Sequence, residues 1–92
     1  MKSDDISNVL LDDITIEILM ALEVENLHVR GLIRAINRNP NAVIKRIRIL
    51  EKYGLIRSIR EEKGHRRKVL MLTTKGLEIL DMFYKIYELF KR

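Results

Sequence analysis

The chain has 92 residues, of which 47% are hydrophobic and 34% charged, and it contains no cysteine. This length and composition predict one small globular domain and exclude disulfide bonds and thiolate metal sites. No apolar run reaches the ~18 residues of a membrane span, and no signal peptide is present, so the sequence predicts a cytoplasmic protein with no membrane partner.

The net charge of +5 is unevenly distributed along the chain. Residues 1–27 contain seven acids and one Lys, whereas residues 28–76 contain fourteen Lys or Arg and three acids, a net charge of +11. Such a concentration of positive charge favours a polyanionic partner, above all nucleic acid. The alternative is that the acidic N-terminal residues lie beside the basic ones in the folded chain and offset their charge.

The N-terminal part of the chain begins with an ambiguous segment, residues 1–11, which is compatible with a short helix or an arm. Residues 12–92 are expected to form a single domain. Its first helix should begin at Asp12 or Asp13, because an Asp side chain accepts a hydrogen bond from a free backbone N–H of the first turn. This helix is predicted to run to about Val24, with an apolar stripe of Ile14, Ile18, Leu19 and Leu22.

A short strand at Leu27 and a second helix over residues 28–37 follow. The cations expected to point outward are Arg30 and Arg34 on this helix and Arg38 just after it. Asn37 stands where the chain needs a left-handed turn, a conformation that Asn tolerates. Only Asn37-Arg38-Asn39 then separates this helix from the next, and two helices joined by three or four residues form a helix-turn-helix.

Residues 40–53 form the third predicted helix, with a defined start and stop. Asn39 is a favourable N-cap, Pro40 suits the first helical position, and Gly54 can adopt the left-handed conformation that ends a helix. The apolar stripe of this helix consists of Val43, Ile47 and Leu50. The polar stripe on the opposite face consists of Asn41, Lys45, Arg48 and Lys52. A basic face opposite a buried stripe suits a helix that reads DNA, but an ordinary surface helix with a solvated charged face shows the same pattern.

The hydrophobic period changes after this helix. Residues 55–60 and 66–73 are apolar or β-branched with partial alternation, and the segment 61–65 between them contains Gly64. This pattern predicts a β-hairpin. The tip of this hairpin carries Lys63, His65, Arg66, Arg67 and Lys68.

The last predicted helix covers about residues 74–92 and is apolar around most of its circumference. Such a helix is buried on more than one side. One side can pack on its own domain, and the other favours the same helix of a second chain, which predicts a homodimer. The residues expected at that interface are Ile79, Met82, Phe83, Ile86, Leu89 and Phe90. Alternatively, the N-terminal segment with Leu10 and Leu11 covers the second side.

Residues 27–56 resemble, without a gap, the core of MarR- and ArsR-like regulators. The matching positions are Leu32 and Ile36 in the second helix, Val43, Ile47 and Leu50 in the recognition helix, Gly54-Leu55-Ile56 in the turn, Leu70, Leu72, Thr73 and Gly76 after the wing, and Arg66 as the wing arginine. The resemblance extends over residues 12–92. It implies an α+β, mostly α, winged helix-turn-helix fold with three helices, a two-stranded wing and a long C-terminal helix.

Several positions depart from the MarR-type pattern. Gly64 replaces the usual Asp of the wing, and His28 and Gly31 replace the residues that usually cap the second helix. The chain also looks too short for the helices that form a MarR effector pocket, so no small-molecule effector is expected. Its size is more similar to compact archaeal or archaeal-virus winged-helix proteins that dimerise through the last helix.

We therefore expect a homodimeric, sequence-specific regulator that binds double-stranded DNA. Alternatives are a sequence-neutral DNA-architectural protein and a protein-interaction module. An enzyme is not expected, because His28 and His65 have no acid placed for a dyad or triad. A metal site is not expected, because the chain has no Cys and no His pair at helical spacing, and no cofactor is expected. In the major groove, Asn41 and Lys45 would reach base edges and Ala42 and Ile44 thymine methyls. The other expected DNA contacts are Arg30, Arg34, Arg38, Asn39, Arg46 and Arg48 on the helices and the cations of the hairpin tip on the backbone or in the minor groove.

Overall fold

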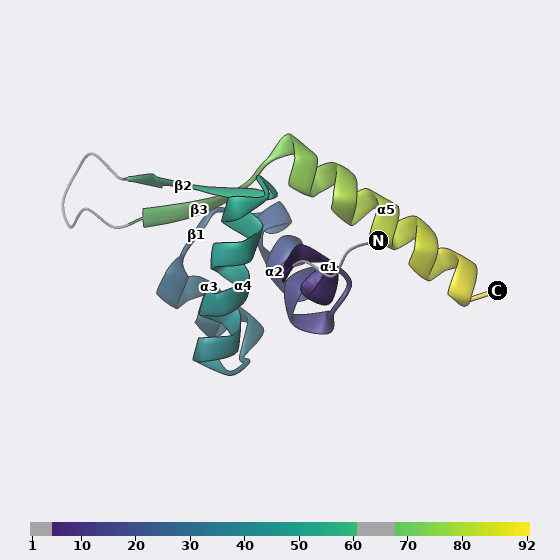
Figure 1. Cartoon of the computed structure of the whole chain (residues 1–92), viewed down its shortest axis with the longest axis horizontal. Coiled ribbons are helices and arrows are strands. Elements are labelled where there is room, and N and C mark those ends of the chain that lie inside the picture. Colours follow the sequence, from purple (N-terminus) through teal and green to yellow (C-terminus); the bar gives the residue numbers. More distant parts are fainter. Residues whose placement is uncertain (1–4, 61–67) are drawn as a thin grey trace.

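The computed structural model describes residues 5–60 and 68–92 and has a winged helix-turn-helix architecture (Figure 1). This confirms the fold expected from the sequence. Residues 5–9 form a short helix, which resolves the ambiguity of the N-terminal segment. The elements in order are α1 (Asp5–Val9), α2 (Asp13–Val24), β1 (Leu27–His28), α3 (Val29–Ile36), α4 (Pro40–Lys52), β2 (Ile56–Arg60), β3 (Lys68–Leu72) and α5 (Thr74–Phe90).

The sheet is antiparallel with the strand order β1-β3-β2. Leu70 of β3 pairs with Leu27 of β1 on one side and with Ser58 of β2 on the other. The short β1 therefore adds a third strand to the expected two-stranded wing. It also ties the start of α3 to the base of the hairpin, because β1 and α3 are directly consecutive.

The core lies where the helices meet the base of the sheet. Each major element contributes at least one fully buried side chain, so that α2, α3, α4, β2, β3 and α5 share a single apolar cluster. These side chains include Leu19, Leu32, Leu50, Leu70 and Leu80. Figure 1 shows α5 leaving this core and extending beyond the other helices. In the described part of the chain, no helix combines the length and the apolar character needed to cross a membrane.

The ends of α4 are determined by local hydrogen bonds. Asn39 Oδ1 accepts a hydrogen bond from the Ala42 amide at 3.1 Å, as expected of an N-cap. At the other end, the Leu55 amide donates to the Leu50 carbonyl at 2.9 Å and the Gly54 amide donates to the Glu51 carbonyl at 3.1 Å. This pair of bonds is a Schellman motif, and it requires the positive φ of 78° at Gly54.

The start of α5 is fastened to the end of α4 through Thr73. Its hydroxyl accepts from the Gly76 amide at 3.0 Å, and its single hydrogen lies within donating distance of the Gly54 carbonyl at 2.6 Å and the Leu55 carbonyl at 2.9 Å. A Cβ at Gly76 would lie 2.1 Å from the Leu55 carbonyl oxygen. Only glycine permits this approach, which sets where α5 leaves the body of the domain.

Replacing Gly76 with Ala is therefore expected to lower the free energy of unfolding by about 1–3 kcal/mol, the usual cost of overpacking. Gly31→Ala is a matched control within a helix, because a Cβ at Gly31 would meet Leu27 Cδ2 at an ordinary 3.6 Å. That control should be neutral or stabilising by up to ~1 kcal/mol. Urea unfolding followed by circular dichroism measures both. Equal stability of the two variants would contradict the prediction.

The helix α1 packs against α4. The Tyr53 hydroxyl donates to Asp5 Oδ1 at 2.6 Å, and Lys52 Nζ lies 3.1 Å from Asp5 Oδ2. These two partners lower the pKa of Asp5, the tyrosine bond contributing most. On the apolar side, Val9 and Ile49 are both buried. Ile49 lay outside the apolar stripe expected for this helix, and the nearby α1 explains why it is nonetheless covered.

Candidate nucleic-acid interface

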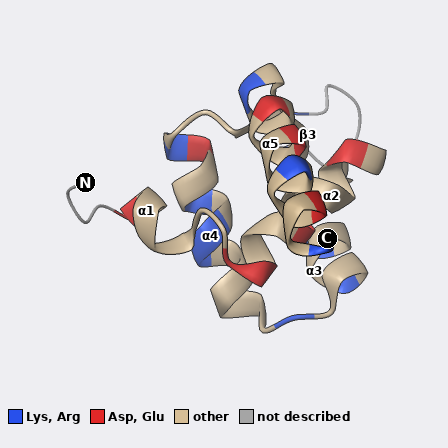
Figure 2. Cartoon of the chain, turned by 90° about the vertical axis from the view of Figure 1, so that its right-hand side faces the viewer, with Lys and Arg blue, Asp and Glu red and all other residues tan. Residues whose placement is uncertain are grey.

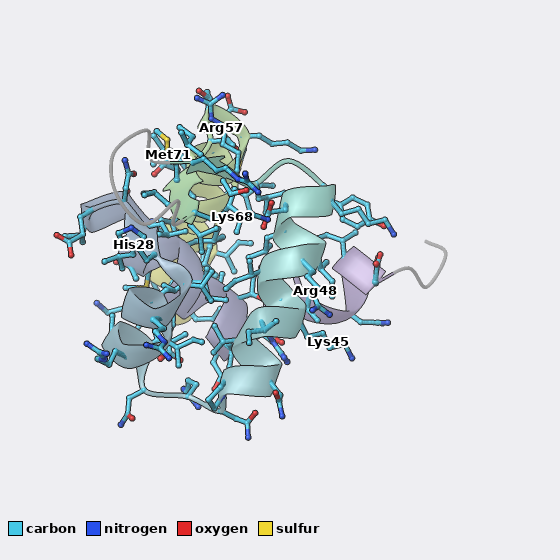
Figure 3. All side chains as sticks on the ribbon, turned by 90° about the vertical axis from the view of Figure 1, so that its left-hand side faces the viewer. His28, Lys45, Arg48, Arg57, Lys68 and Met71 are labelled. Carbon is cyan, nitrogen blue, oxygen red and sulfur yellow. The ribbon has the colours of Figure 1, made fainter. Side chains whose placement is uncertain are left out.

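The exposed face of α4 presents the polar stripe expected from the sequence. Asn41, Lys45 and Arg48 are exposed on it, and Ile44 is half-buried beside them. Figure 3 shows Lys45 and Arg48 on α4, with Arg57 of β2 and Lys68 of β3 on the hairpin, from the side where the hairpin projects toward the viewer. The fold therefore combines cations from the helix and the hairpin on one side of the molecule.

Several cations on this side are not neutralised by a neighbouring carboxylate of the described residues. Among residues 5–60 and 68–92, the side chains of Lys45, Arg48 and Arg57 form no ion pair with a described acid. The same holds for Arg30, which is exposed in the first turn of α3. An unpaired surface cation binds a phosphate without first having to give up a carboxylate.

Arg38, in the turn between α3 and α4, is placed differently. Its guanidinium bonds both Asp13, at 3.1 Å, and Glu17 of α2. Both carboxylates raise the pKa of Arg38, and Glu17 has the larger effect. The proposed phosphate contact of Arg38 would therefore compete with two carboxylates.

Arg46 is also engaged by α2. Its Nη2 lies 2.7 Å from Asp12 Oδ2, its Nε donates to the same oxygen at 2.9 Å, and its Nη1 donates to the Ala42 carbonyl at 3.0 Å. Only 19% of the Arg46 side chain is exposed. The other oxygen of Asp12 accepts from the Thr15 amide at 2.8 Å and so caps α2. One carboxylate therefore fixes both the start of α2 and the middle of α4.

The acidic N-terminal segment thus offsets part of the basic charge, as the alternative interpretation of the charge pattern proposed. Figure 2 shows acidic segments on α2 and basic segments on α3 and α4. The offset is selective, since it involves Arg38 and Arg46 and spares Lys45 and Arg48. Ala42 lies on the Arg46 side of α4, because its carbonyl accepts from that guanidinium.

Acid should weaken the Asp12 contact. Partial burial raises the pKa of Asp12, but the hydrogen bonds from Arg46 and from Thr15 lower it more, so the pKa lies below the usual 3.8. A depressed carboxylate pKa stabilises the fold above the unfolded value, and this stabilisation is lost as the pH falls through the folded pKa. The free energy of unfolding should therefore decrease below about pH 4.

Asp12→Asn keeps a capping oxygen but loses the charge, so it should cost about 1.5–3 kcal/mol at neutral pH, the range of a hydrogen bond to a charged group. The difference from the unchanged protein should shrink on acidification, because Asp12 is then protonated in both states. Chemical unfolding between pH 2.5 and 7 measures this. Glu78→Gln, at an exposed position of α5, is the control and should leave the profile unchanged. A constant difference at every pH would refute the assignment.

Part of the expected wing lies outside the described residues, namely Lys63, His65, Arg66 and Arg67. Lys68 begins β3 and is exposed. It lines a cavity of about 280 Å³ with His28, Val29 and Arg30, where the hairpin meets the start of α3. Arg57 and Arg60, both exposed on β2, had no place in the expected contact set. For Arg57, its alternation with Ile56 and Ser58 was the available signal, whereas Arg60 shares the face of Ile56 and Ser58 and gave no such signal.

The helix α5 divides the residues expected at a dimer interface into two groups. Ile79 and Phe83 pack against the core of their own chain. Met82, Ile86, Leu89 and Phe90 are 59%, 41%, 62% and 83% exposed. In the N-terminal segment, Leu10 packs against the core, whereas Leu11 is 58% exposed. That segment therefore leaves the outer side of α5 open.

Comparison with solved structures identifies the fold family. A MepR variant from S. aureus superposes with a TM-score of 0.81 and 22% sequence identity, covering 94% of this chain and 65% of that chain. The fold is that of MarR- and PadR-family winged-helix regulators. A PadR-family transcription regulator from Clostridium difficile matches with a TM-score of 0.80 and 20% identity, over 87% of this chain and 92% of that one.

Other neighbours include ZitR, a zinc-responsive MarR family member from Lactococcus lactis, with a TM-score of 0.73, 27% identity, and coverage of 94% of this chain and 60% of that one. MepR is also known as a complex with DNA. The chain thus spans less than two thirds of the MepR variant and of ZitR. No family model matches the sequence, and no curated protein matches it either.

Proposed function

We propose that this protein is a sequence-specific regulator that binds double-stranded DNA as a homodimer, with α4 as its recognition helix. The observation that carries the proposal is the division of the cations around α4. Arg38 and Arg46 are held by carboxylates of α2, while Lys45 and Arg48 are exposed and unpaired among the described residues. The fold therefore holds the helix in place with one set of cations and presents another set outward.

The polar face of α4 suits a major groove, which is wide enough to admit a helix. Asn41 has the amide pattern that pairs with adenine, and Lys45 can donate to the acceptors of guanine. Ile44 beside them can contact a thymine methyl group. Arg48, one turn further along, is assigned to a phosphate. The N-cap Asn39 keeps its amide donors for the same groove, since the cap uses only its oxygen.

Phosphate contacts from the rest of this side would set the register of the helix. They are assigned to Arg30, Arg57 and Lys68, with the cations of the hairpin tip beyond them. Compared with the expectation from the sequence, Arg46 moves from phosphate binding to positioning of α4, because its guanidinium is bound to Asp12. Ala42 lies on the same side of α4 as Arg46, so it is no longer assigned to a base edge.

The dimer is assigned to α5, whose exposed apolar side chains include Met82, Ile86 and Leu89. A two-fold axis through this helix places two copies of α4 on one duplex, at half-sites about one helical turn (~10 base pairs) apart. The recognition of DNA and the association of the two chains then use different elements of a single domain.

The test is selection of duplexes from a random pool, followed by titration of the selected duplex and of a shuffled one at the same salt concentration. A regulator should prefer the selected duplex by ~10³ or more. Equal affinity for both duplexes would instead indicate a sequence-neutral architectural protein. Absence of binding even at low salt would refute DNA binding.

A further inference from the structure

The end of α4 and the start of α5 are joined by several hydrogen bonds. The Thr73 amide donates to the Leu55 carbonyl at 3.1 Å, and the Thr73 hydroxyl lies within donating distance of the Gly54 and Leu55 carbonyls. Lys75 Nζ donates to the Tyr53 carbonyl at 2.7 Å. These contacts, between residues 53–55 and 73–76, form a joint that connects the helix assigned to DNA with the helix assigned to the dimer.

Lys75 occupies a position where local preference disfavours a cation. It lies in the first turn of α5, and the N-terminal end of a helix carries partial positive charge. That first turn contains no acid to offset the ammonium group. The carbonyls at the end of α4, in contrast, carry partial negative charge and have no partner further along that helix. Lys75 therefore caps the C-terminal end of α4 from a different element of the fold.

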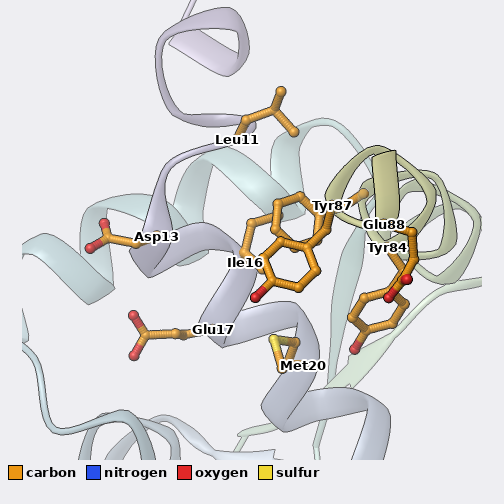
Figure 4. Close-up of a pocket in the computed structure, with 9 residues that line it drawn as sticks. Leu11, Asp13, Ile16, Glu17, Met20, Tyr84, Tyr87 and Glu88 are labelled. Carbon is orange, nitrogen blue, oxygen red and sulfur yellow. The ribbon is translucent and has the colours of Figure 1, made fainter. Parts of the chain in front are cut away.

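The direction of α5 depends on its first half. Its contacts with the core end near its middle, since Phe83 and Tyr84 pack against the core whereas Leu89 is 62% exposed. The outer half borders an apolar groove of about 550 Å³, with Met20 of α2 on one wall and Tyr87 on the other (Figure 4). Because this groove separates the outer half of α5 from α2, the contacts at the start of the helix determine where its end points.

We propose that Lys75 is a positioning residue, which fixes the angle between α4 and α5 and thereby the half-site spacing that the homodimer accepts. The inference rests on the DNA-binding homodimer proposed above. In that dimer, α5 determines where the second chain lies, and α4 determines where each chain meets the duplex. Freedom at the joint then becomes freedom in the distance and angle between the two copies of α4.

Half-site spacing is a demanding requirement for a rigid dimer. One base pair inserted between the half-sites moves the second of them by about 3.4 Å along the duplex and rotates it by roughly 35°. A dimer with a rigid joint cannot follow both changes, so it loses part of the gain from linking two binding modules. Thr73 holds α5 at one point, and Lys75 adds a second point that resists rotation about the first.

The test is titration of the selected duplex and of duplexes with one base pair inserted or removed between the half-sites. The unchanged protein should prefer the best spacing by ~10-fold or more, and Lys75→Met should reduce this preference to about 3-fold or less. Methionine keeps an unbranched side chain but lacks the ammonium group. The affinity for a duplex with a single half-site, and the dimer dissociation constant from sedimentation equilibrium, should both stay unchanged.

Two matched variants accompany this test. Lys85→Met removes the same charge from an exposed position further along α5 and should keep the full spacing preference. Lys75→Arg retains a cationic donor and should restore most of the preference that Lys75→Met loses. A Lys75→Met variant whose affinity falls by one common factor at every spacing would show that Lys75 contacts a phosphate, and it would overturn the inference.

An unchanged spacing preference in Lys75→Met would also overturn the inference, while leaving the DNA-binding dimer intact. Failure of the proposed function would show in the unchanged protein instead, as a monomer at tens of micromolar or as absence of binding at low salt. Either result would overturn the inference together with the function on which it rests.

A distance measurement reads the joint without DNA. Because the chain contains no cysteine, spin labels can be attached to an Asn41→Cys, Lys85→Cys variant, with one label on α4 and one on α5. Dilution with unlabelled protein ensures that both labels of a measured pair belong to one chain. The distribution of distances should be broader when Lys75→Met is added, because the second point of attachment is lost. Distributions of equal width would contradict the role assigned to Lys75.

Discussion

Replacing Lys45 with Ala is expected to reduce the discrimination between the selected duplex and its single-base variants by about 1–3 kcal/mol, or roughly 5–150-fold. Lys45 is exposed on the face of α4 that is proposed to enter the groove, and no described acid competes for its ammonium group. Its loss should therefore act at a particular base position. Titration of a panel of duplexes, each changed at one position, measures the effect.

The control for this prediction is Lys85→Ala, which removes the same charge from an exposed position on α5. It should leave the preference among the duplexes unchanged. If Lys45→Ala lowered the affinity for every duplex by one common factor, Lys45 would be a phosphate contact, and the base-reading role would pass to its neighbours on α4.

Ile86→Glu is expected to convert the protein to a monomer and to weaken its affinity for a two-half-site duplex by ~10²–10⁴, the gain that linking two binding modules provides. Ile86 is 41% exposed on α5, and in the proposed dimer it is buried against the second chain. A glutamate there would have to be desolvated without a partner. Sedimentation equilibrium and titration of the duplex measure the two effects.

Val24→Glu is the matched control, since it introduces the same charge at an apolar residue that is 83% exposed on α2. It should remain a dimer with unchanged DNA affinity. An Ile86→Glu variant that sediments as a dimer would remove α5 from the interface. A monomeric variant that keeps full affinity would show instead that each chain binds DNA alone.

The fold could be predicted from the sequence because its decisive signals are local. Asn39 and Pro40 determine where α4 begins, and Gly54 with its positive φ of 78° determines where it ends. Asn37, with φ of 50°, makes the turn of the helix-turn-helix. Each of these effects depends on backbone conformation within a few residues, so the sequence contains all that is needed to recognise it.

The division of the cations around α4 could not be predicted in the same way. Arg46 and Asp12 are 34 positions apart, and only the packing of α2 against α4 brings them together. The helical period placed Arg48 but not Arg46 on the polar stripe, yet both were expected to contact DNA, because nothing in the sequence pairs Arg46 with an acid. Their surroundings differ because Arg46 is paired with Asp12 at the start of α2 and Arg48 is exposed to solvent.

The surface of α5 was predictable only in part, for a related reason. The helical period identified two apolar arcs, but it could not tell where the body of the domain would end along the helix. Ile79 and Phe83 fall within reach of the core, and Ile86 and Leu89 lie beyond it. That boundary is set by the exit of α5 at Thr73 and Gly76, which is a tertiary contact with the Leu55 carbonyl.

The carboxylates that hold Arg38 and Arg46 also determine how the protein should respond to ionic strength. Each cation that neutralises a phosphate releases counterions from the duplex, which adds about 0.9 to the slope of log affinity against log salt concentration. An arginine that stays paired with Asp12, or with Asp13 and Glu17, releases none. In the free protein, Arg38 and Arg46 are already neutralised by carboxylates of the same chain. The salt dependence of the DNA affinity should therefore reflect only the cations that no carboxylate neutralises.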